Sequence, residues 1–160
     1  MRQLRKSDIR KINEQLTREY EGQFSISPKS KVIAKEIEEK GRKTEVLVID
    51  GKPSFFFRHE KIFPTLNILV EKNPLKRVTV DMGAVKFVVN GADIMRPGVV
   101  GCDETVTKEE PVCIVDETHG KPLAVGIALF DAGELLNQTK GKVVANLHYA
   151  GDKIWNAGEG

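Results

Sequence analysis

Cysteines, aromatic residues and long apolar runs are all scarce in this 160-residue chain. Two cysteines cannot supply the disulfide framework that holds small secreted domains together. No run approaches the ~18 apolar residues that cross a bilayer, and the N-terminus lacks the apolar segment of a secretory signal. With 40% hydrophobic residues the chain can still bury a core. We therefore expect a soluble, cytoplasmic protein without a membrane partner, built from one large or two small domains.

Motifs for catalysis and cofactor binding are also missing. The sequence contains no nucleophile elbow, Walker loop, His-Glu-x-x-His motif or dinucleotide-binding glycine pattern, so no cofactor is expected. Cys102, Cys113 and His119 are soft ligands, but their spacing is poor for zinc and no fourth ligand is near, so no metal is expected. Cys113, Asp116 and His119 could bring a thiol to an imidazole, but a core cysteine and a solvated turn histidine explain the same residues. We therefore expect that this protein is not an enzyme.

Charge is unevenly distributed along the chain. Residues 1–73 carry 16 Lys and Arg against 11 Asp and Glu, a net charge of +5, whereas residues 74–160 carry 9 against 12, a net charge of −3. A basic half can attract phosphate or an acidic partner, although this excess is also common on ordinary solvated surfaces. Charge alone therefore does not identify a nucleic-acid-binding protein.

The first half contains both helical and strand patterns. A helix is predicted from Ser7, as N-cap, to about Gly22, with four inward apolar residues: Ile9, Ile12, Leu16 and Tyr20. Residues 31–39 fit either a helix or a strand, and propensity alone favours the helix. Asp50-Gly51 predicts a hairpin between residues 44–49 and 54–58, because both turn positions need positive φ.

A second helix is predicted to open at Pro64, with Leu66, Leu69 and Val70 pointing inward, and to close at Asn73-Pro74. This point, where the composition changes, is the expected domain boundary.

Short strands punctuated by glycine, proline and acidic turns dominate the second half. Strands are predicted at residues 78–80, 111–116, 122–130 and 142–149, and Asp81 is the expected N-cap of a helix from Gly83 to Asn90. Asp131 and Glu134 suggest a capping box. In the last strand we expect Val143, Ala145, Leu147 and Tyr149 to point inward and Val144, Asn146 and His148 outward. About five short strands with helical excursions indicate a small mixed barrel.

Several of these segments together resemble a known family. Residues 80–98, Val-Asp-Met-Gly-Ala-Val-Lys-Phe-Val-Val-Asn-Gly-Ala-Asp-Ile-Met-Arg-Pro-Gly, resemble the opening strand, helix and turn of a PUA domain. The agreement continues through residues 123–126 and 146–149 and ends with Trp155. Upstream, the Asp50-Gly51 hairpin, residues 55–58 and residues 64–66 are similar to the pre-PUA domain of the malignant-T-cell-amplified-sequence proteins and the ligatin-type initiation factors.

This resemblance implies an α+β architecture. A small α/β pre-PUA domain, residues 1–73, would precede a PUA pseudobarrel of mixed strands and short helices, residues 74–160. It also implies that residues 31–38 form a strand. The loop from Cys102 to Glu110 departs from the eukaryotic relatives, so their protein-partner contacts are not carried over.

The resemblance further implies a non-enzymatic RNA-binding protein that contacts the small ribosomal subunit and the acceptor end of a tRNA. The alternative is an accessory RNA-targeting subunit for a tRNA- or rRNA-modifying enzyme. The expected partners are rRNA or tRNA, with a protein partner left open. PUA domains bind RNA along the first helix, the following turn and the last strand, which here correspond to Gly83, Ala84, Lys86, Asn90, Arg96, Pro97, Gly98, Lys142, His148 and Lys153.

Residue chemistry is compatible with this set. Lys86 and Asn90 share one side of the helix, Arg96 can fork onto a phosphate, and the Gly83 and Ala84 amides lie where anions are favoured. Asp81, as the N-cap, would occupy one of those amides and repel phosphate. Five basic residues of the first domain would add contact to ribosomal RNA: Arg2, Arg5, Lys6, Arg10 and Lys11.

Overall fold

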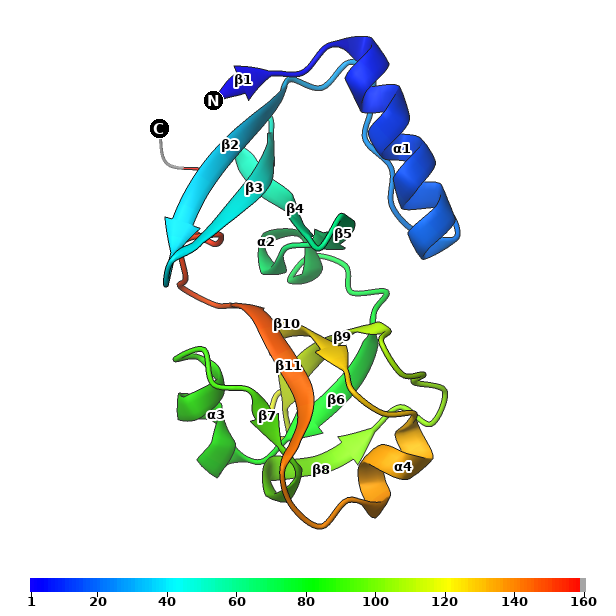
Figure 1. Ribbon diagram of the computed structural model, residues 1–160, viewed down its shortest axis with the longest axis vertical. Helices are drawn as coiled ribbons and strands as arrows, with labels where there is room; N and C mark the ends of the chain where they lie inside the picture. Colours follow the sequence, from blue (N-terminus) through cyan, green and yellow to red (C-terminus); the bar gives the residue numbers. More distant parts are fainter. Residues whose placement is uncertain (159–160) are drawn as a thin grey trace. The chain divides into compact units, whose positions relative to one another are not determined.

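The computed structural model describes residues 1–158, which form two compact units (Figure 1). The first unit comprises Met1–Asn67 together with the segment from Lys153, and the second comprises Ile68–Asp152. The sequence groups that C-terminal segment with the second domain, whereas the structure places it in the first unit. There Asn67 Nδ2 donates to the Trp155 carbonyl at 3.2 Å, and Ile154 is buried.

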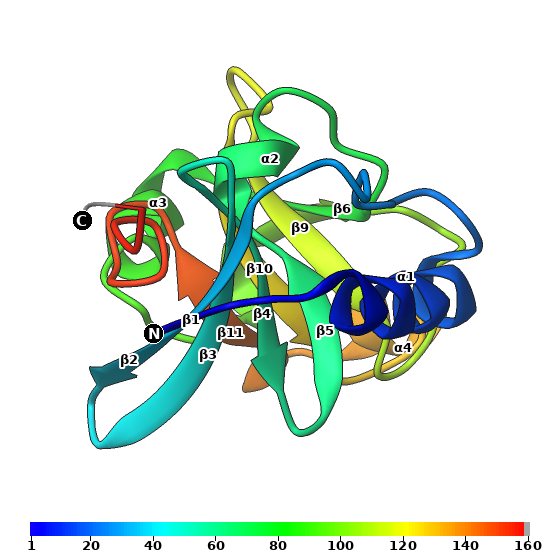
Figure 2. The ribbon, with the colours of Figure 1, turned by 90° about the horizontal axis from the view of Figure 1, so that it is seen from above.

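A five-stranded sheet in the order β1-β2-β3-β4-β5 forms the first unit. Its strands are Arg2–Gln3 (β1), Val32–Glu39 (β2), Arg42–Ile49 (β3), Lys52–Arg58 (β4) and Lys61–Pro64 (β5). Helix α1, Lys6–Tyr20, lies beside β5 (Figure 2). The Tyr20 hydroxyl donates to the Ile62 carbonyl, and the Glu19 carboxylate accepts the Ile62 N–H at 3.1 Å. β5 is an edge strand, so these two side chains bind backbone groups of Ile62 that would otherwise lack hydrogen-bond partners in the sheet.

Two strand predictions for this unit are confirmed. Asp50 and Gly51 have φ of +49° and +86° and join β3 to β4 as an antiparallel hairpin. Residues 32–39 are a strand, as the family resemblance implied, and the helical preference is wrong. The reason is that β2 pairs with β3 along its whole length, from Val32 opposite Ile49 to Glu39 opposite Arg42. That pairing is long-range and overrides local propensity.

Helix boundaries in the first half differ from the prediction. α1 begins at Lys6 with Arg5 as N-cap, so Ser7 lies within the first turn. Pro64 ends β5 and does not open a helix. The short helix that follows, α2, Leu66–Leu69, spans the point where the chain divides. Leu66 and Leu69 are buried as expected, but Val70 is 51% exposed.

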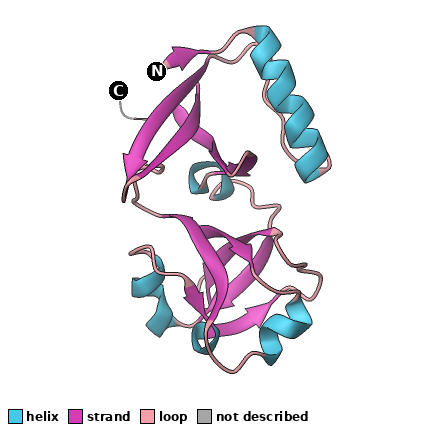
Figure 3. Cartoon of the chain, viewed as in Figure 1, coloured by secondary structure: helices cyan, strands magenta, loops and turns pink. Residues whose placement is uncertain are grey.

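The second unit is built on a six-stranded mixed sheet, one strand more than expected, in the order β7-β11-β10-β9-β6-β8. Its strands are Lys76–Val80 (β6), Ile94–Met95 (β7), Val99–Cys102 (β8), Pro111–Asp116 (β9), Pro122–Ala128 (β10) and Lys142–Tyr149 (β11). β6 and β9 pair in parallel. The sheet curls into a nearly closed pseudobarrel around one apolar core, and short helices connect its strands (Figure 3). The expected α+β class is confirmed.

For two of those helices, the sequence predicted the N-cap residue. α3 spans Met82–Val88 with Asp81 as its N-cap, as predicted, although it ends before Asn90. α4 spans Ala132–Asn137 after Asp131, but the Asp131 carboxylate accepts the Lys108 N–H at 2.7 Å and does not cap the helix. The expected capping box is therefore wrong. No helix within residues 1–158 is both long and apolar enough to cross a membrane.

The alternation predicted for the last strand is wrong at Val144 and His148, because both are fully buried. β10 and β11 are in register from Ala128 opposite Val144 to Gly126 opposite Asn146, but Val125 then lies opposite His148. One residue, Leu147, is therefore left over as a bulge. A bulge shifts the inward-outward phase of the strand beyond it, which turns His148 into the interior.

The bulge explains a glycine whose substitution we expect to be costly. A Cβ on Gly126 would lie 2.5 Å from the Ala145 carbonyl and 2.7 Å from Val144 Cγ1, whereas a Cβ on Gly133 in α4 would meet nothing within 4 Å. We expect Gly126→Ala to destabilise the protein by about 1–3 kcal/mol and Gly133→Ala to be neutral or stabilising by up to about 1 kcal/mol. Urea denaturation measures both, and equal stability of the two variants would contradict the register.

Candidate nucleic-acid interface

The N-terminus of α3 is occupied by two carboxylates. Asp81 Oδ1 accepts the Ala84 N–H at 2.9 Å, and Glu117 Oε2, from the turn after β9, accepts the Met82 N–H at 2.8 Å. A seven-residue helix needs such caps, because it has few internal hydrogen bonds. The expectation that the Ala84 amide would receive an anion is therefore wrong: the amide is already bonded, and the two carboxylates repel phosphate.

An apolar groove lies alongside this helix. It has a volume of about 380 Å³ and is bounded by α3, by β7 and by η1, the 3₁₀ turn Arg96–Gly98. Gly83, Ala84, Pro97 and Gly98, from the predicted set, line it. Gly98 allows η1 to lie close to α3, since a Cβ on Gly98 would lie 3.0 Å from Ala84 Cβ.

Two large apolar side chains stand exposed at the groove. Phe87 on α3 is 57% exposed and Met95 on β7 is 50% exposed. Sequence reasoning placed Phe87 on the helix but gave it no role. Its spacing from Gly83 and Asn90 puts it on their face of the helix, and a large aromatic residue on the same face as a glycine and an asparagine was the available signal.

Lys86 is the one predicted cation that remains available at the groove. Its Nζ lies 5.2 Å from the centroid of the Phe87 ring, within cation–π range. Within residues 1–158 the Lys86 ammonium has no ion-pair or hydrogen-bond partner. Asn90 is exposed beside it, and its Nδ2 donates to the Lys86 carbonyl at 2.8 Å.

Arg96 has a structural role. Its Nη1 donates to the Val99 carbonyl at 2.9 Å, and its Nη2 and Nε donate to the Leu136 carbonyl at 3.1 and 3.3 Å. Leu136 belongs to the last turn of α4, whose carbonyls lack partners within the helix. The guanidinium thus joins η1 to the end of α4, and a phosphate that binds Arg96 would have to compete with these hydrogen bonds.

The end of α3 is tied to β11 by polar side chains. Asn146 Nδ2 donates to the carbonyls of Val88 and Ala92, and Asp93 Oδ1 accepts the Asn146 N–H at 2.8 Å. The other oxygen of Asp93 pairs with Lys142 Nζ at 2.8 Å. Lys142 is half exposed, but its charge is already balanced.

His148 and Lys153 do not join the groove. His148 is buried, and its Nδ1 lies 2.9 Å from the Asp152 carboxylate, so the expected outward placement is wrong. Lys153 belongs to the first unit, where its Nζ donates to the Glu38 carbonyl at 2.7 Å.

The cysteine and histidine candidates form no reactive group. Cys113 is fully buried, and burial raises the pKa of its thiol to about 12. The backbone N–H groups of His119, Lys121 and Thr118 bind the Asp116 carboxylate and hold its pKa below the usual value. Asp116 is thereby committed to the turn. Among residues 1–158 no three His, Cys, Asp or Glu side chains gather as a metal site.

Two family matches cover nearly the whole chain. Residues 76–150 match the family described as the PUA domain, and residues 3–72 match a domain of unknown function, DUF1947. The second of these corresponds to the pre-PUA domain.

Three curated relatives are similar to this chain. An uncharacterised protein of Methanocaldococcus jannaschii is 43% identical over 96% of this chain and 93% of its own. Malignant T-cell-amplified sequence 2 of Mus musculus is 33% identical over 96% of this chain and 89% of its own. Translation machinery-associated protein 20 of Schizosaccharomyces pombe is 37% identical over 59% of this chain and 55% of its own.

Two solved structures share the fold. A hypothetical protein of the hyperthermophilic archaeon Pyrococcus horikoshii OT3 has a TM-score of 0.78 and 35% identity, with 98% of each chain covered. A PUA domain protein of Aeropyrum pernix K1, crystallised as a tartrate complex, has a TM-score of 0.81 and 28% identity, with 99% of this chain and 90% of its own covered.

The Arg96 bridge gives a stability prediction. Arg96→Met keeps the length of the side chain but removes the donors to Val99 and Leu136, so we expect a loss of about 1–3 kcal/mol in the free energy of unfolding. Lys86→Met is the matched control and should change stability by less than about 0.5 kcal/mol. Urea unfolding measures both, and an unchanged midpoint for Arg96→Met would refute the bridging role.

Burial gives a reactivity prediction for Cys113. A thiol with a pKa of about 12 is almost wholly protonated at pH 8 and is shielded from reagents. We expect iodoacetamide to leave Cys113 unmodified in the native protein, where the half-buried Cys102 reacts slowly, and to alkylate both cysteines at similar rates in urea. Peptide mass spectrometry distinguishes the two sites, and rapid native labelling of Cys113 would contradict its placement.

Proposed function

Since this chain belongs to the family of malignant T-cell-amplified-sequence proteins and carries a PUA domain, we propose that it is a non-enzymatic, translation-associated RNA-binding factor that contacts the small ribosomal subunit and the acceptor end of a tRNA. PUA domains bind RNA, and the S. pombe relative is named for its association with the translation machinery.

The observation that carries the proposal is the exposed Phe87 ring beside Lys86 at the edge of an apolar groove. An aromatic face stacks on a nucleobase, and the adjacent ammonium can meet the phosphate of the same nucleotide. Only unstacked bases can enter such a groove, because bases within a duplex are paired and covered. The unpaired 3′ end of a tRNA acceptor stem supplies such bases.

The charges around the groove restrict how the strand can lie. Asp81 and Glu117 at the start of α3 repel phosphate, whereas Lys86 attracts it. The phosphate backbone would therefore pass on the Lys86 side, with the base directed toward the apolar lining. Exocyclic amines of the base could donate to the Asp81 carboxylate, since each carboxylate oxygen has room for more than one donor.

The basic first unit supplies a second, less specific contact in this proposal. Arg10 and Lys11 lie exposed on α1, while Arg2 and Arg5 lie 3.6 and 3.8 Å from the Asp8 carboxylate and are partly neutralised. Lys6 is also exposed at the first turn of the helix. Ribosomal RNA is the polyanion that such a surface would meet during translation in the cytoplasm.

A binding experiment with matched variants tests this function. With an RNA hairpin that carries an unpaired 3′ CCA tail, we expect Phe87→Ala to weaken binding about 5- to 100-fold through lost stacking. Lys86→Ala should weaken it less and reduce the salt slope by about 0.7. Val100→Ala and Lys108→Ala remove an exposed apolar and an exposed basic side chain outside the groove and should bind as the unaltered protein does. Fluorescence anisotropy at two salt concentrations measures these effects.

The ribosomal part is tested by sedimentation with small ribosomal subunits, using the same four variants and a fifth protein that combines Arg10→Ala with Lys11→Ala. Co-sedimentation that is lost on combining Arg10→Ala with Lys11→Ala would support the basic surface. If the protein binds the tailed hairpin no better than a blunt one, or if Phe87→Ala has no effect, the groove is not the RNA site. Copurification with an RNA-modifying enzyme in place of small subunits would indicate an accessory targeting subunit.

A further inference from the structure

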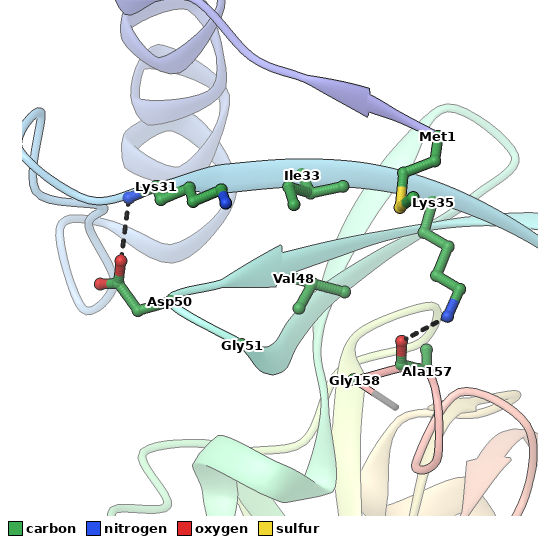
Figure 4. Close-up of a pocket in the computed structure, with 9 residues that line it drawn as sticks. All are labelled: Met1, Lys31, Ile33, Lys35, Val48, Asp50, Gly51, Ala157 and Gly158. Atoms are coloured by element: carbon green, nitrogen blue, oxygen red, sulfur yellow. Dashed lines mark hydrogen bonds between the residues drawn. The ribbon is translucent and has the colours of Figure 1, made fainter. Parts of the chain in front are cut away.

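A second cavity lies within the first unit. Its volume is about 350 Å³, within the range of roughly 300–1,000 Å³ of small-molecule sites. It is formed by β2, the β3–β4 hairpin turn and the C-terminal segment, with Met1 at its rim (Figure 4). It shares no lining residue with the groove beside α3.

Hydrogen bonds fix the walls of this cavity. Asp50 Oδ1 accepts the Lys31 N–H at 2.9 Å, and the Asp50 N–H donates to the Lys31 carbonyl at 2.9 Å, which locks the hairpin turn to the start of β2. Across the cavity, Lys35 Nζ donates to the Ala157 carbonyl at 3.0 Å. The C-terminal segment is thus held as one wall.

A close backbone contact completes that wall. A Cβ on Gly158 would lie 2.6 Å from the Gly51 carbonyl and 2.8 Å from Pro53 Cδ, so the segment crosses the hairpin turn at a distance only glycine permits. A cavity held on both sides in this way is preformed, and a ligand would not have to order it on binding.

The cavity has an apolar floor and a cationic edge. Ile33 and Val48, which lie opposite one another on β2 and β3, point into it. Figure 4 shows the Lys31 side chain extending along β2 toward Ile33. Within residues 1–158 the Lys31 ammonium has no ion-pair or hydrogen-bond partner. The Asp50 carboxylate is bonded to the backbone of Lys31, and Lys35 adds a second positive charge.

We propose that this cavity binds a compact organic carboxylate, with its apolar body on Ile33 and Val48 and its carboxylate paired with Lys31. One available ammonium beside an apolar floor suits a singly charged ligand with an apolar body. Phosphate carries more charge and would need several converging donors, whereas one ammonium is available here. The volume fits a small acid better than a peptide segment, and the charge excludes amines.

The test uses 4-methylbenzoate as the probe and 4-methylbenzamide, its neutral counterpart, as the control. Both are titrated into the full-length, ¹⁵N-labelled protein, and amide shifts are followed by NMR. We expect saturable shifts with the acid at Ile33, Gly51 and Ala157, with a Kd of about 10 mM or tighter, and no saturation with the amide. Equal binding of both probes, or no saturable shift with the acid, overturns the proposal.

Two variants and a matched control locate the site. Lys31→Gln should weaken binding of 4-methylbenzoate about fivefold or more, whereas Lys29→Gln, at an exposed lysine outside the cavity, should leave it unchanged. Ile33→Trp should abolish it by filling the space. If Ile33→Trp does not fold, the lysine pair still decides, because both lysines are exposed. An unchanged Kd in Lys31→Gln also overturns the proposal.

Discussion

A helix of seven residues is not stable in water through its own hydrogen bonds alone. In the second unit, side chains near both ends of α3 supply the missing hydrogen-bond partners. Asp81 and Glu117 satisfy amides at one end, and Asn146 satisfies carbonyls at the other. Asn146 is in turn oriented by Asp93, which also pairs with Lys142. The polar side chains near the groove are therefore mostly used to hold the helix in place.

Because these polar side chains hold α3 in place, a ligand would meet mainly the other side chains around the groove. Arg96 and Lys142, which resemble phosphate contacts in the sequence, are bonded to carbonyls or to a carboxylate. What remains on the helix is an exposed aromatic ring, a neighbouring ammonium and an apolar groove. In the proposed function, recognition at this surface depends more on stacking than on charge, in keeping with the net charge of −3 in this half of the chain. Electrostatic attraction to a polyanion is then assigned to the basic half.

Sequence reasoning succeeded where the determinants are local. The Asp50-Gly51 hairpin follows from two adjacent φ values, and the cap at Asp81 from one side chain and the amide three residues on. The misplaced helix starts at Ser7 and Pro64 are local errors, but the other failures came where the determinant is remote in sequence. Propensity favoured a helix at residues 31–39 because it takes no account of the pairing of this segment with β3. His148 was placed outward because the bulge at Leu147 shows only in the pairing with β10. For the site, the sequence identified the cations. It did not identify the carbonyls of Val99 and Leu136, 3 and 40 residues from Arg96, which accept hydrogen bonds from its guanidinium.

The path of the backbone makes the second unit an insertion within the first, because the chain leaves the first unit after Asn67 and re-enters it at Lys153. In the sequence, a truncation after Asp152 would look like a change confined to the second domain. It would instead remove Ile154 and Ala157 from the interior of the opposite unit and deprive Lys35 of its acceptor. The core of the first unit therefore cannot be completed during synthesis until Ile154 and Ala157 have been added, although most of its residues precede the second unit in the chain.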